Sequence, residues 1–178
     1  MTKTRCSWAG PDEIYIKYHD EEWGIPTHDD RELFEMLVLE SFQAGLSWIT
    51  ILKKRQNFKK AFDDFDVEKV AAYDESKISE LLENEGIIRH RGKITSAINN
   101  AQVLIEIQKE FGSFDSYIWS FTDGKIIKAE YLTESDLSKD ISKDLKRRGM
   151  KFVGPTIIYS YLESIGIIDN HQKECFKY

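Results

Sequence analysis

The chain has few cysteines and no long apolar run. Its 178 residues include 2 cysteines, Cys6 and Cys175, near opposite ends of the sequence. We therefore expect no disulfide framework, in keeping with a reducing compartment. No stretch of about 18 apolar residues offers a membrane span, and the opening MTKTRCSWAG lacks the apolar core of a signal peptide. These absences predict a soluble cytoplasmic protein with no membrane partner.

Strand patterns are also scarce, whereas helical spacing of apolar residues dominates. We predict an all-α fold, an orthogonal helical bundle in which residues 1–178 form a single domain. The one candidate strand pair is a small hairpin in FTDGKII, around Asp123 and Gly124. Residues 112–140 receive no predicted function. Helices are expected from about residue 31 and over 47–62, 67–73, 76–84, 92–112, 114–119, 137–149 and 154–166.

Basic residues are gathered in three clusters, although the chain carries a formal net charge of -6. The clusters occupy residues 53–60, 89–93 and 146–151. Each one alone fits a solvated helix face. Because the distribution of charge matters more than its total for nucleic-acid binding, the three together predict an anion-binding surface.

A short basic link bounded by glycines joins two of the expected helices. The first helix ends near Gly86 and the second begins near Gly92, which predicts a helix-hairpin-helix over about residues 76–110. Free N–H groups at the start of the second helix, with its dipole, would hold a phosphate. An ordinary turn between helices fits the spacing at least as well. The basic side chains that could assist are Arg89, Arg91 and Lys93.

Thiol and imidazole side chains occur near both ends of the chain. Cys6 and His19 lie near the start, and His171 and Cys175 stand four residues apart, where a helical or tightly turned tail would place them on one side. Two thiolates and two imidazoles complete a tetrahedral zinc set with no open position, so the predicted Zn²⁺ is structural and ties the ends together. The alternative is a buried thiol and exposed histidines that never meet.

A glutamate interrupts the apolar face of the helix that begins near residue 31. At about 100° per residue, Glu40 falls on the same face as Leu33, Leu37 and Ala44. An ionised carboxylate removed from water costs several kcal/mol unless it is paired. The sequence therefore predicts a partner for Glu40, without naming it.

Aromatic residues are dense around this glutamate in the sequence. Density of this kind commonly marks a core. Together with an inward carboxylate and the small residues Ala44 and Gly45, it also describes a pocket for a flat cation or a flat hydrogen-bonding ring. The aromatic residues concerned are Trp8, Tyr15, Tyr18, Trp23 and Trp48.

Five long segments of the chain can be compared with known families: CSWAGPDEIYIKYHDEEWGIP, LFEMLVLESFQAGLSWITILKKR, EGIIRHRGKI, KRRGMKFVGPTIIYSYLESIG and DNHQKEC. They resemble, in the same order, the motifs of the bacterial 3-methyladenine DNA glycosylase I family. The resemblance covers about residues 5–175 and is weakest at 112–140. It implies the helix-hairpin-helix glycosylase fold, base-excision activity on 3-methyladenine and a double-stranded DNA partner, and we expect a monomer.

Roles carried over from the family fall on matching residues of this sequence. Glu40 would hydrogen-bond the base, Trp48 and Tyr15 would stack on it, and Tyr18 would bound the pocket, with Trp8 and Trp23 close by. The hairpin from Gly86 through Gly92 to Lys93 would bind phosphate. Leu46 is a candidate to fill the gap left by a flipped base. The implied zinc ligands are Cys6, His19, His171 and Cys175.

Two other classes of protein remain compatible with these residues. One is a non-catalytic helix-hairpin-helix DNA-binding module with a zinc site, in which the aromatic cluster is core. The buried Glu40 argues against it, because a structural core has little use for a carboxylate. The other is a binder of free methylated purines, which would give the basic link at residues 89–93 no role.

Overall fold

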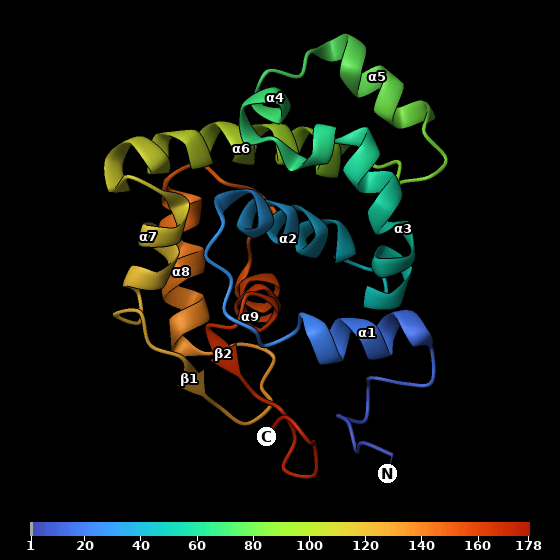
Figure 1. Ribbon diagram of the computed structural model, residues 1–178. Helices are drawn as coiled ribbons and strands as arrows, with labels where there is room; N and C mark the ends of the chain where they lie inside the picture. The colour runs from blue at the N-terminus through green and yellow to red at the C-terminus, as the bar shows by residue number, and fades with distance from the viewer. Residues whose placement is uncertain (1) are drawn as a thin grey trace.

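The computed structural model describes residues 2–178, and nearly all of its regular structure is helical (Figure 1). This confirms the predicted all-α class. Within the described residues, no helix is long and apolar enough to cross a bilayer. The elements are α1 (Glu13–Glu21), α2 (Asp30–Gln43), α3 (Trp48–Ala61), the 3-10 helix η1 (Asp63–Phe65), α4 (Val67–Ala71), α5 (Glu75–Glu83), α6 (Arg91–Phe111), α7 (Phe114–Ser120), β1 (Ile127–Lys128), α8 (Asp136–Arg147), α9 (Pro155–Ser164) and β2 (Ile168–Asp169).

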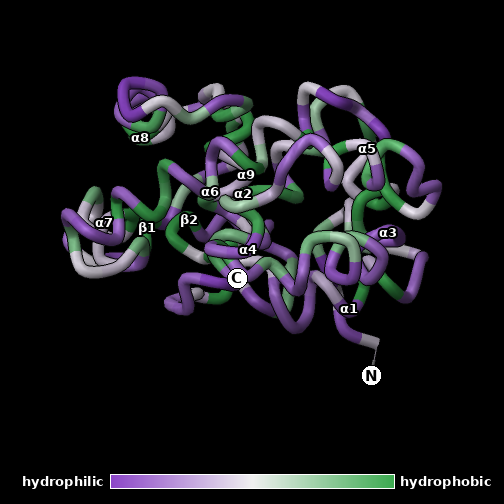
Figure 2. The backbone as a smooth tube through the Cα atoms, turned by 90° about the horizontal axis from the view of Figure 1, so that it is seen from above, coloured by the Kyte–Doolittle hydropathy of each residue, from purple (hydrophilic) through white to green (hydrophobic). Residues whose placement is uncertain are grey.

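Helix α2 is the central element of the bundle. Every residue from 33 to 42 is buried, and the helix packs against α3, α6, α7 and α9. In Figure 1 it lies between α6 above and α9 below, and Figure 2 shows α2 and α9 in the middle of the molecule when seen from above. Because these residues are buried, a charged side chain in this stretch is removed from bulk water, whether or not another group pairs with it.

Two aspartates fix the start of α2. Asp29 is the N-cap, and its side chain accepts a hydrogen bond from the Glu32 N–H at 3.1 Å. The Asp30 carboxylate accepts from the backbone N–H groups of Phe114 and Asp115 at 2.9 and 2.8 Å, at the start of α7. Capping by Asp29 agrees with the predicted helix start, and Asp30 ties α2 to α7.

The hairpin expected around Asp123 and Gly124 is wrong. These residues form a turn after α7, and β1 then pairs in parallel with β2, with Ile127 opposite Ile168. The structure also contains helix α1, which was not among the predicted helices. Its start is capped by Asp12, whose side chain accepts from the Ile14 N–H at 3.1 Å.

The end of α9 is joined to the segment after α1 by close backbone contact. The N–H groups of Gly24 and Thr27 donate to the carbonyls of Glu163 and Ile165 at 3.1 and 2.9 Å. Gly166, with φ of 79°, allows this approach, since a Cβ there would lie 2.3 Å from the Ile25 carbonyl carbon. The segment after α1 and the end of α9, which are far apart in the sequence, therefore pack directly against each other.

Candidate functional site

A cavity of about 250 Å³ lies among α1, α2, α3 and α9. Its lining includes Glu40 and every aromatic residue that the sequence places in a pocket. Tyr15 and Tyr18 come from α1, and Trp48 is the first residue of α3. The remaining predicted aromatics in the lining are Trp8 and Trp23.

Contacts between aromatic rings hold these walls together. The Trp8 ring meets Tyr15 and Trp23 edge to face, with centroids 5.3 and 4.9 Å apart. Tyr18 lies tilted against Trp48 at 5.6 Å. Contacts of this kind are favourable for aromatic rings, so the rings pack against one another as the walls of the cavity.

Glu40 is buried in this cavity without a partner. The residue is 4 % exposed, and its Oε2 atom has no hydrogen-bond partner among residues 2–178. Buried polar groups are nearly always hydrogen-bonded, so an orphaned carboxylate oxygen marks a site rather than a core. Burial, followed by the nearby charge of Glu163, raises the pKa of Glu40 well above its ordinary value.

A second buried glutamate on α2 shows how the same fold pairs a carboxylate. Glu35 is 5 % exposed, and its Oε1 accepts from Arg55 Nε at 2.8 Å, with Lys59 Nζ 3.7 Å away. Arg55 also donates to Glu22 at 2.7 Å. Glu35 is therefore neutralised by protein side chains, whereas Glu40, on the same helix, is not.

Four lining residues were not among the predicted site residues. The most informative is Glu163 on α9, since burial raises its pKa to about 7. The signal in the sequence was a single carboxylate in the otherwise apolar and aromatic stretch PTIIYSYLES. The other three are Gln43, Tyr131 and Ser160.

Trp48 provides a hydrogen-bond donor without a partner, just as Glu40 provides an acceptor without one. Its indole Nε1 is buried and has no acceptor within residues 2–178. A ligand that both donates and accepts hydrogen bonds, and that is flat enough to lie between rings, would satisfy both groups. The cavity is thus suited to a nitrogen heterocycle.

Helices α5 and α6 and the link between them occupy the stretch for which a helix-hairpin-helix is expected. Arg89 is exposed, and His90 caps α6 by accepting from the Lys93 N–H at 3.1 Å. Within residues 2–178 the N–H groups of Arg91 and Gly92 have no acceptor. The Arg91 side chain pairs with Glu75. Near the first glycine of the link, a Cβ on Gly86 would lie 3.0 Å from Asn57 Cγ.

The phosphate contact expected of the Lys93 side chain must be corrected. Lys93 is 7 % exposed, and its Nζ donates to the carbonyls of Phe42 at 2.9 Å and Ala44 at 2.6 Å. Its ammonium group therefore holds the C-terminal end of α2 and points away from solvent. The turn that it fixes leads to Gly45, with φ of 80°, and to Leu46, which is 39 % exposed.

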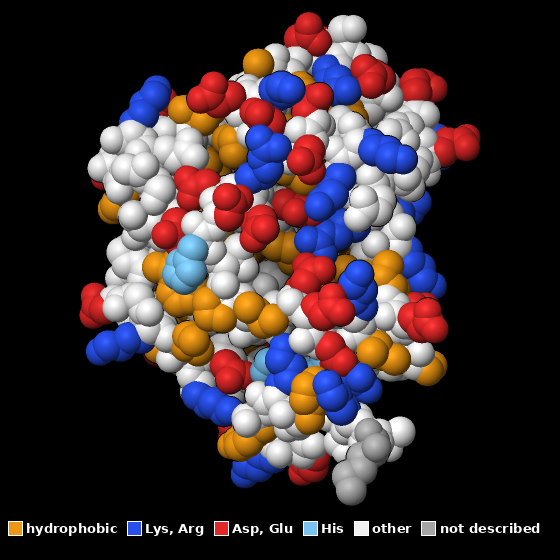
Figure 3. All heavy atoms as spheres, in the orientation of Figure 1, with side chains coloured by type: hydrophobic (Ala, Val, Ile, Leu, Met, Phe, Trp, Pro, Cys, Tyr) orange, Lys and Arg blue, Asp and Glu red, His pale blue; other side chains and the backbone are white. Residues whose placement is uncertain are grey.

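The basic clusters expected to form one anion-binding surface are partly neutralised. Arg55 belongs to the ion pairs with Glu22 and Glu35, and Arg148 pairs with Glu110 and Asp144 at 2.7 and 2.8 Å. On the face shown in Figure 3, basic and acidic side chains lie interleaved. A sequence count of lysines and arginines therefore overstated the free positive charge.

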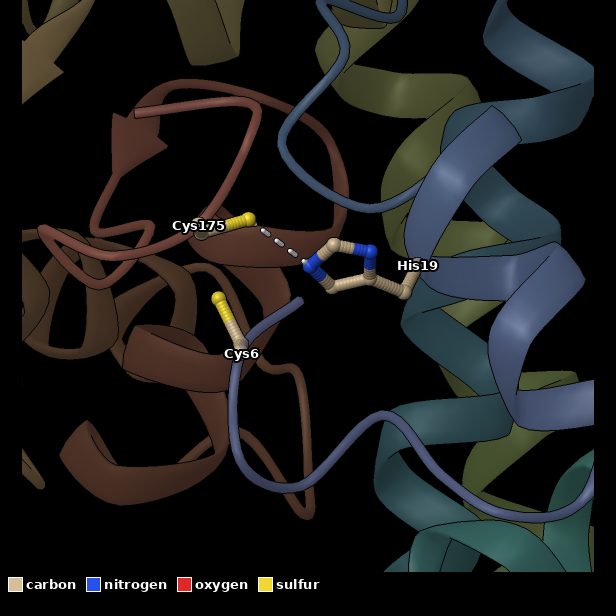
Figure 4. A group of neighbouring side chains, drawn as sticks. All are labelled: Cys6, His19 and Cys175. Carbon is tan, nitrogen blue, oxygen red and sulfur yellow. Dashed lines mark hydrogen bonds between the residues drawn. The ribbon is translucent and has the colours of Figure 1, made fainter. Parts of the chain in front are cut away.

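The two cysteines and His19 form a buried cluster that joins the ends of the chain. Their ligand atoms lie within 4.8 Å of one another, and the His19 Nε2 is 3.5 Å from the Cys175 Sγ (Figure 4). Burial raises the pKa of the Cys6 thiol to about 11. Because a buried thiol resists ionisation at neutral pH, a cation would be needed to hold it as a thiolate. The cluster has the composition of a metal site.

His171 lies beside the cluster but is not one of its three members. Its ring is 5.4 Å from that of His19, and its Nε2 is buried with no partner in residues 2–178. The Nδ1 atom of His171 lies 2.7 Å from Asp169, and that of His19 lies 2.8 Å from Asp20. A carboxylate on Nδ1 leaves the Nε2 lone pair free, which is the arrangement common among histidines that bind metals.

The metal cluster and the cavity share a wall. The Trp8 ring lies 5.3 Å from His19, and the Trp23 ring lies 4.7 Å from His171. Any ion that fixes these histidines would also fix the two tryptophans that line the cavity.

Sequence comparisons extend over nearly the whole chain. A family model described as methyladenine glycosylase matches residues 8–178. The chain is 44% identical to DNA-3-methyladenine glycosylase 1 of Escherichia coli K12, over 98% of this chain and 96% of the relative. It is 42% identical to DNA-3-methyladenine glycosylase of Haemophilus influenzae, over 97% and 96% respectively. The chain belongs to the methyladenine glycosylase family.

Solved structures of the family agree with the fold described above. A crystal structure of 3-methyladenine DNA glycosylase I matches with a TM-score of 0.94 and 45% identity, over 97% of this chain and 98% of that chain. The 3-methyladenine DNA glycosylase I of Staphylococcus aureus matches with a TM-score of 0.93 and 40% identity, over 97% and 95%. The resemblance read from the sequence motifs is confirmed.

Replacing Glu40 by glutamine should stabilise this family member at alkaline pH. The folded-state pKa of Glu40 lies above the unfolded-state value, so the wild-type protein loses stability as pH rises from the unfolded-state pKa of about 4.3 through the folded-state pKa, because the unfolded chain ionises more readily. Glutamine does not ionise. We expect Glu40→Gln to raise the free energy of unfolding by about 1 to 3 kcal/mol at about pH 8, with a smaller difference at about pH 5, in urea denaturation.

The matched control is Glu35→Gln on the same helix. It leaves Arg55 with a buried neutral partner, so we expect the free energy of unfolding to fall by about 1 to 3 kcal/mol. Equal destabilisation by both substitutions would mean that Glu40 is paired in the free protein.

Proposed function

We propose that this protein is a DNA-3-methyladenine glycosylase I, which hydrolyses the N-glycosidic bond of 3-methyladenine in double-stranded DNA and leaves an abasic site. The observation that carries the proposal is the unpaired Glu40 carboxylate inside an aromatic cavity. Membership of the methyladenine glycosylase family supports it, as do relatives named for this activity. The protein supplies an acceptor that only a ligand can satisfy.

The target nucleotide must leave the base stack to reach Glu40. A base inside a duplex is inaccessible, so the nucleotide rotates out, and weak pairing of a damaged base lowers the energy required. Methylation at N3 gives the adenine ring a formal positive charge. The base therefore departs as a neutral molecule, and the enzyme needs no strong general acid.

Recognition in the cavity uses charge and stacking together. Glu40 accepts hydrogen bonds from N–H groups of the base, and Trp48 and Tyr15 stack on its faces. Tyr18 bounds the pocket. Ordinary adenine lacks the positive charge, so it gains less from the carboxylate and from cation-π contact in a water-poor cavity.

DNA is held through its phosphates in this proposal. The free N–H groups of Arg91 and Gly92, at the start of α6, are oriented to bind a phosphate oxygen, with Arg89 beside them. Leu46, exposed on the turn after α2, fills the gap that the flipped base leaves. Affinity for undamaged duplex should then fall steeply with salt and show little sequence preference.

The metal is proposed to be one structural Zn²⁺, held by Cys6, His19, His171 and Cys175. The fit rests on the buried cluster of three ligand atoms and on the orphaned Nε2 of the fourth residue. Four protein ligands leave no open position for chemistry. The ion joins the ends of the chain and braces the walls that Trp8 and Trp23 form.

Excision of 3-methyladenine tests the function directly. Methylated duplex DNA is incubated with the protein, and released bases are measured by chromatography. We expect the wild-type protein to release 3-methyladenine and Glu40→Gln to reduce the rate by at least about tenfold, because a charge-assisted hydrogen bond to the base is lost.

Glu32→Gln is the matched control, since Glu32 lies on the same helix and is exposed. It should retain full activity. Both variants should bind undamaged duplex as the wild type does. Full excision by Glu40→Gln would remove this carboxylate from recognition.

Removing a cysteine ligand tests the metal site. We expect about one zinc per chain in the wild-type protein by elemental analysis. In Cys175→Ser we expect loss of zinc and a melting temperature lower by several degrees, because the chain ends lose their link. His171→Ala should also lower the zinc content, and His28→Ala, at an exposed histidine, should not. A metal-free wild-type protein of equal stability would contradict the proposal.

A further inference from the structure

The loop between α8 and α9 is held rigidly by buried polar side chains. Asn100 on α6 donates to the Lys151 carbonyl at 2.8 Å and accepts from the Lys151 N–H at 2.9 Å. Ser41 donates to the Phe152 carbonyl at 3.0 Å, and Ser142 donates to the Val153 carbonyl at 2.7 Å. All three of these polar residues are buried. Three successive loop residues are therefore fixed from inside the protein.

Phe152 adopts a strained conformation in this loop. Its φ is 55°, a left-handed value that a bulky residue rarely takes. The strain does not bury its side chain, since Phe152 is 36 % exposed while its neighbours Met150 and Val153 are buried. Strain of this kind persists where surrounding contacts impose it and gathers at functional sites. The fold here presents an aromatic ring to solvent.

Contacts place Phe152 beside the hairpin helix α6 and beside α2, whose C-terminal turn carries Leu46. Its ring lies 6.2 Å from that of His90, the residue that caps the hairpin helix α6. Its carbonyl is bound by Ser41, next to Glu40 on α2. Lys93 joins α6 to the turn that carries Leu46. The hairpin, this turn and the α8–α9 loop are thus held to one another by direct contacts.

The residues around Phe152 favour a nucleic-acid partner. Lys151, next to Phe152, and Arg89, next to His90, are both exposed. An aromatic ring beside free positive charge suits a base stack flanked by phosphates. A protein partner would more commonly need a larger apolar area than this single ring.

We propose that Phe152 inserts into the DNA base stack next to the flipped nucleotide, as a second wedge alongside Leu46. This inference rests on the proposed glycosylase function. When a nucleotide rotates out, its neighbours lose a stacking partner, and an aromatic ring can cover the exposed base face. Phe152 thereby favours the extruded state without touching the base in the pocket.

A fluorescent base tests insertion without requiring catalysis. A duplex carries 2-aminopurine beside an abasic-site analogue, and its fluorescence rises when stacking is disturbed. We expect the wild-type protein to change this fluorescence and Phe152→Ala to lose most of the change. Excision of 3-methyladenine from duplex DNA by Phe152→Ala should fall roughly tenfold, the scale of one lost stacking contact. Binding of free 3-methyladenine, followed by tryptophan fluorescence, should stay unchanged.

Two further variants separate insertion from a structural role. Phe152→Gly relieves the positive φ, so we expect a melting temperature close to the wild-type value together with the same loss of the fluorescence change. Ile126→Ala is the control, since Ile126 is an exposed apolar residue just before β1. It should behave as the wild type in every assay.

The outcomes distinguish this inference from the proposed function. If the wild-type protein excises 3-methyladenine while Phe152→Ala retains both excision and the fluorescence change within twofold, the wedge is refuted and the function stands. Weaker binding of free 3-methyladenine by Phe152→Ala would also refute it, because the substitution would then act through the pocket. If the wild-type protein excises nothing, the proposed function fails, and the fluorescence change still decides whether Phe152 inserts.

Discussion

The central constraint on this structure is the carboxyl group of Glu40, which the fold buries without a hydrogen-bond partner. Residues 33–42 of helix α2 are all buried, so Glu40 is only 4 % exposed, and its Oε2 has no partner in the described chain. The fold pairs a carboxylate elsewhere on the same helix, where Arg55 neutralises Glu35. The unpaired carboxyl group therefore lowers the stability of the free protein. A ligand that brings N–H groups or positive charge into the cavity offsets this cost.

The rest of the molecule can be understood as the frame of this cavity. Its walls come from segments far apart in sequence: the N-terminal tryptophans, α1, the start of α3, and α9. The Cys6, His19 and Cys175 cluster joins the chain ends directly behind Trp8 and Trp23. The cluster therefore lies directly against two of the rings that line the cavity.

Local patterns in the sequence predicted much of this arrangement. The spacing from Leu33 placed Glu40 inward, and the residue types of Cys6, His19 and Cys175 indicated their convergence. Helices α2 and α6 followed from apolar periodicity. Each of these predictions rests either on the spacing of residues within one helix or on residue types, cysteine and histidine, that are rare in this chain.

Features that depend on distant neighbours were missed or misread. Lys93 looks like a surface cation in RHRGK, yet its Nζ bonds carbonyls about fifty positions earlier in the chain. Glu163 gave no periodic signal, because it enters the cavity only through the packing of α9 on α2. The parallel pairing of β1 with β2 joins segments separated by a helix pair, which a search for hairpins cannot detect.

The ionisation state of Glu40 is the most direct test of this account. The carboxyl carbon of Glu40 can be followed by ¹³C NMR through a pH titration, with assignment from the Glu40→Gln variant. We predict a pKa well above the ordinary glutamate value in the free protein, and a lower pKa when 3-methyladenine is bound, because hydrogen bonds to the carboxylate favour its charged form. An ordinary pKa that does not change on binding the base would contradict it.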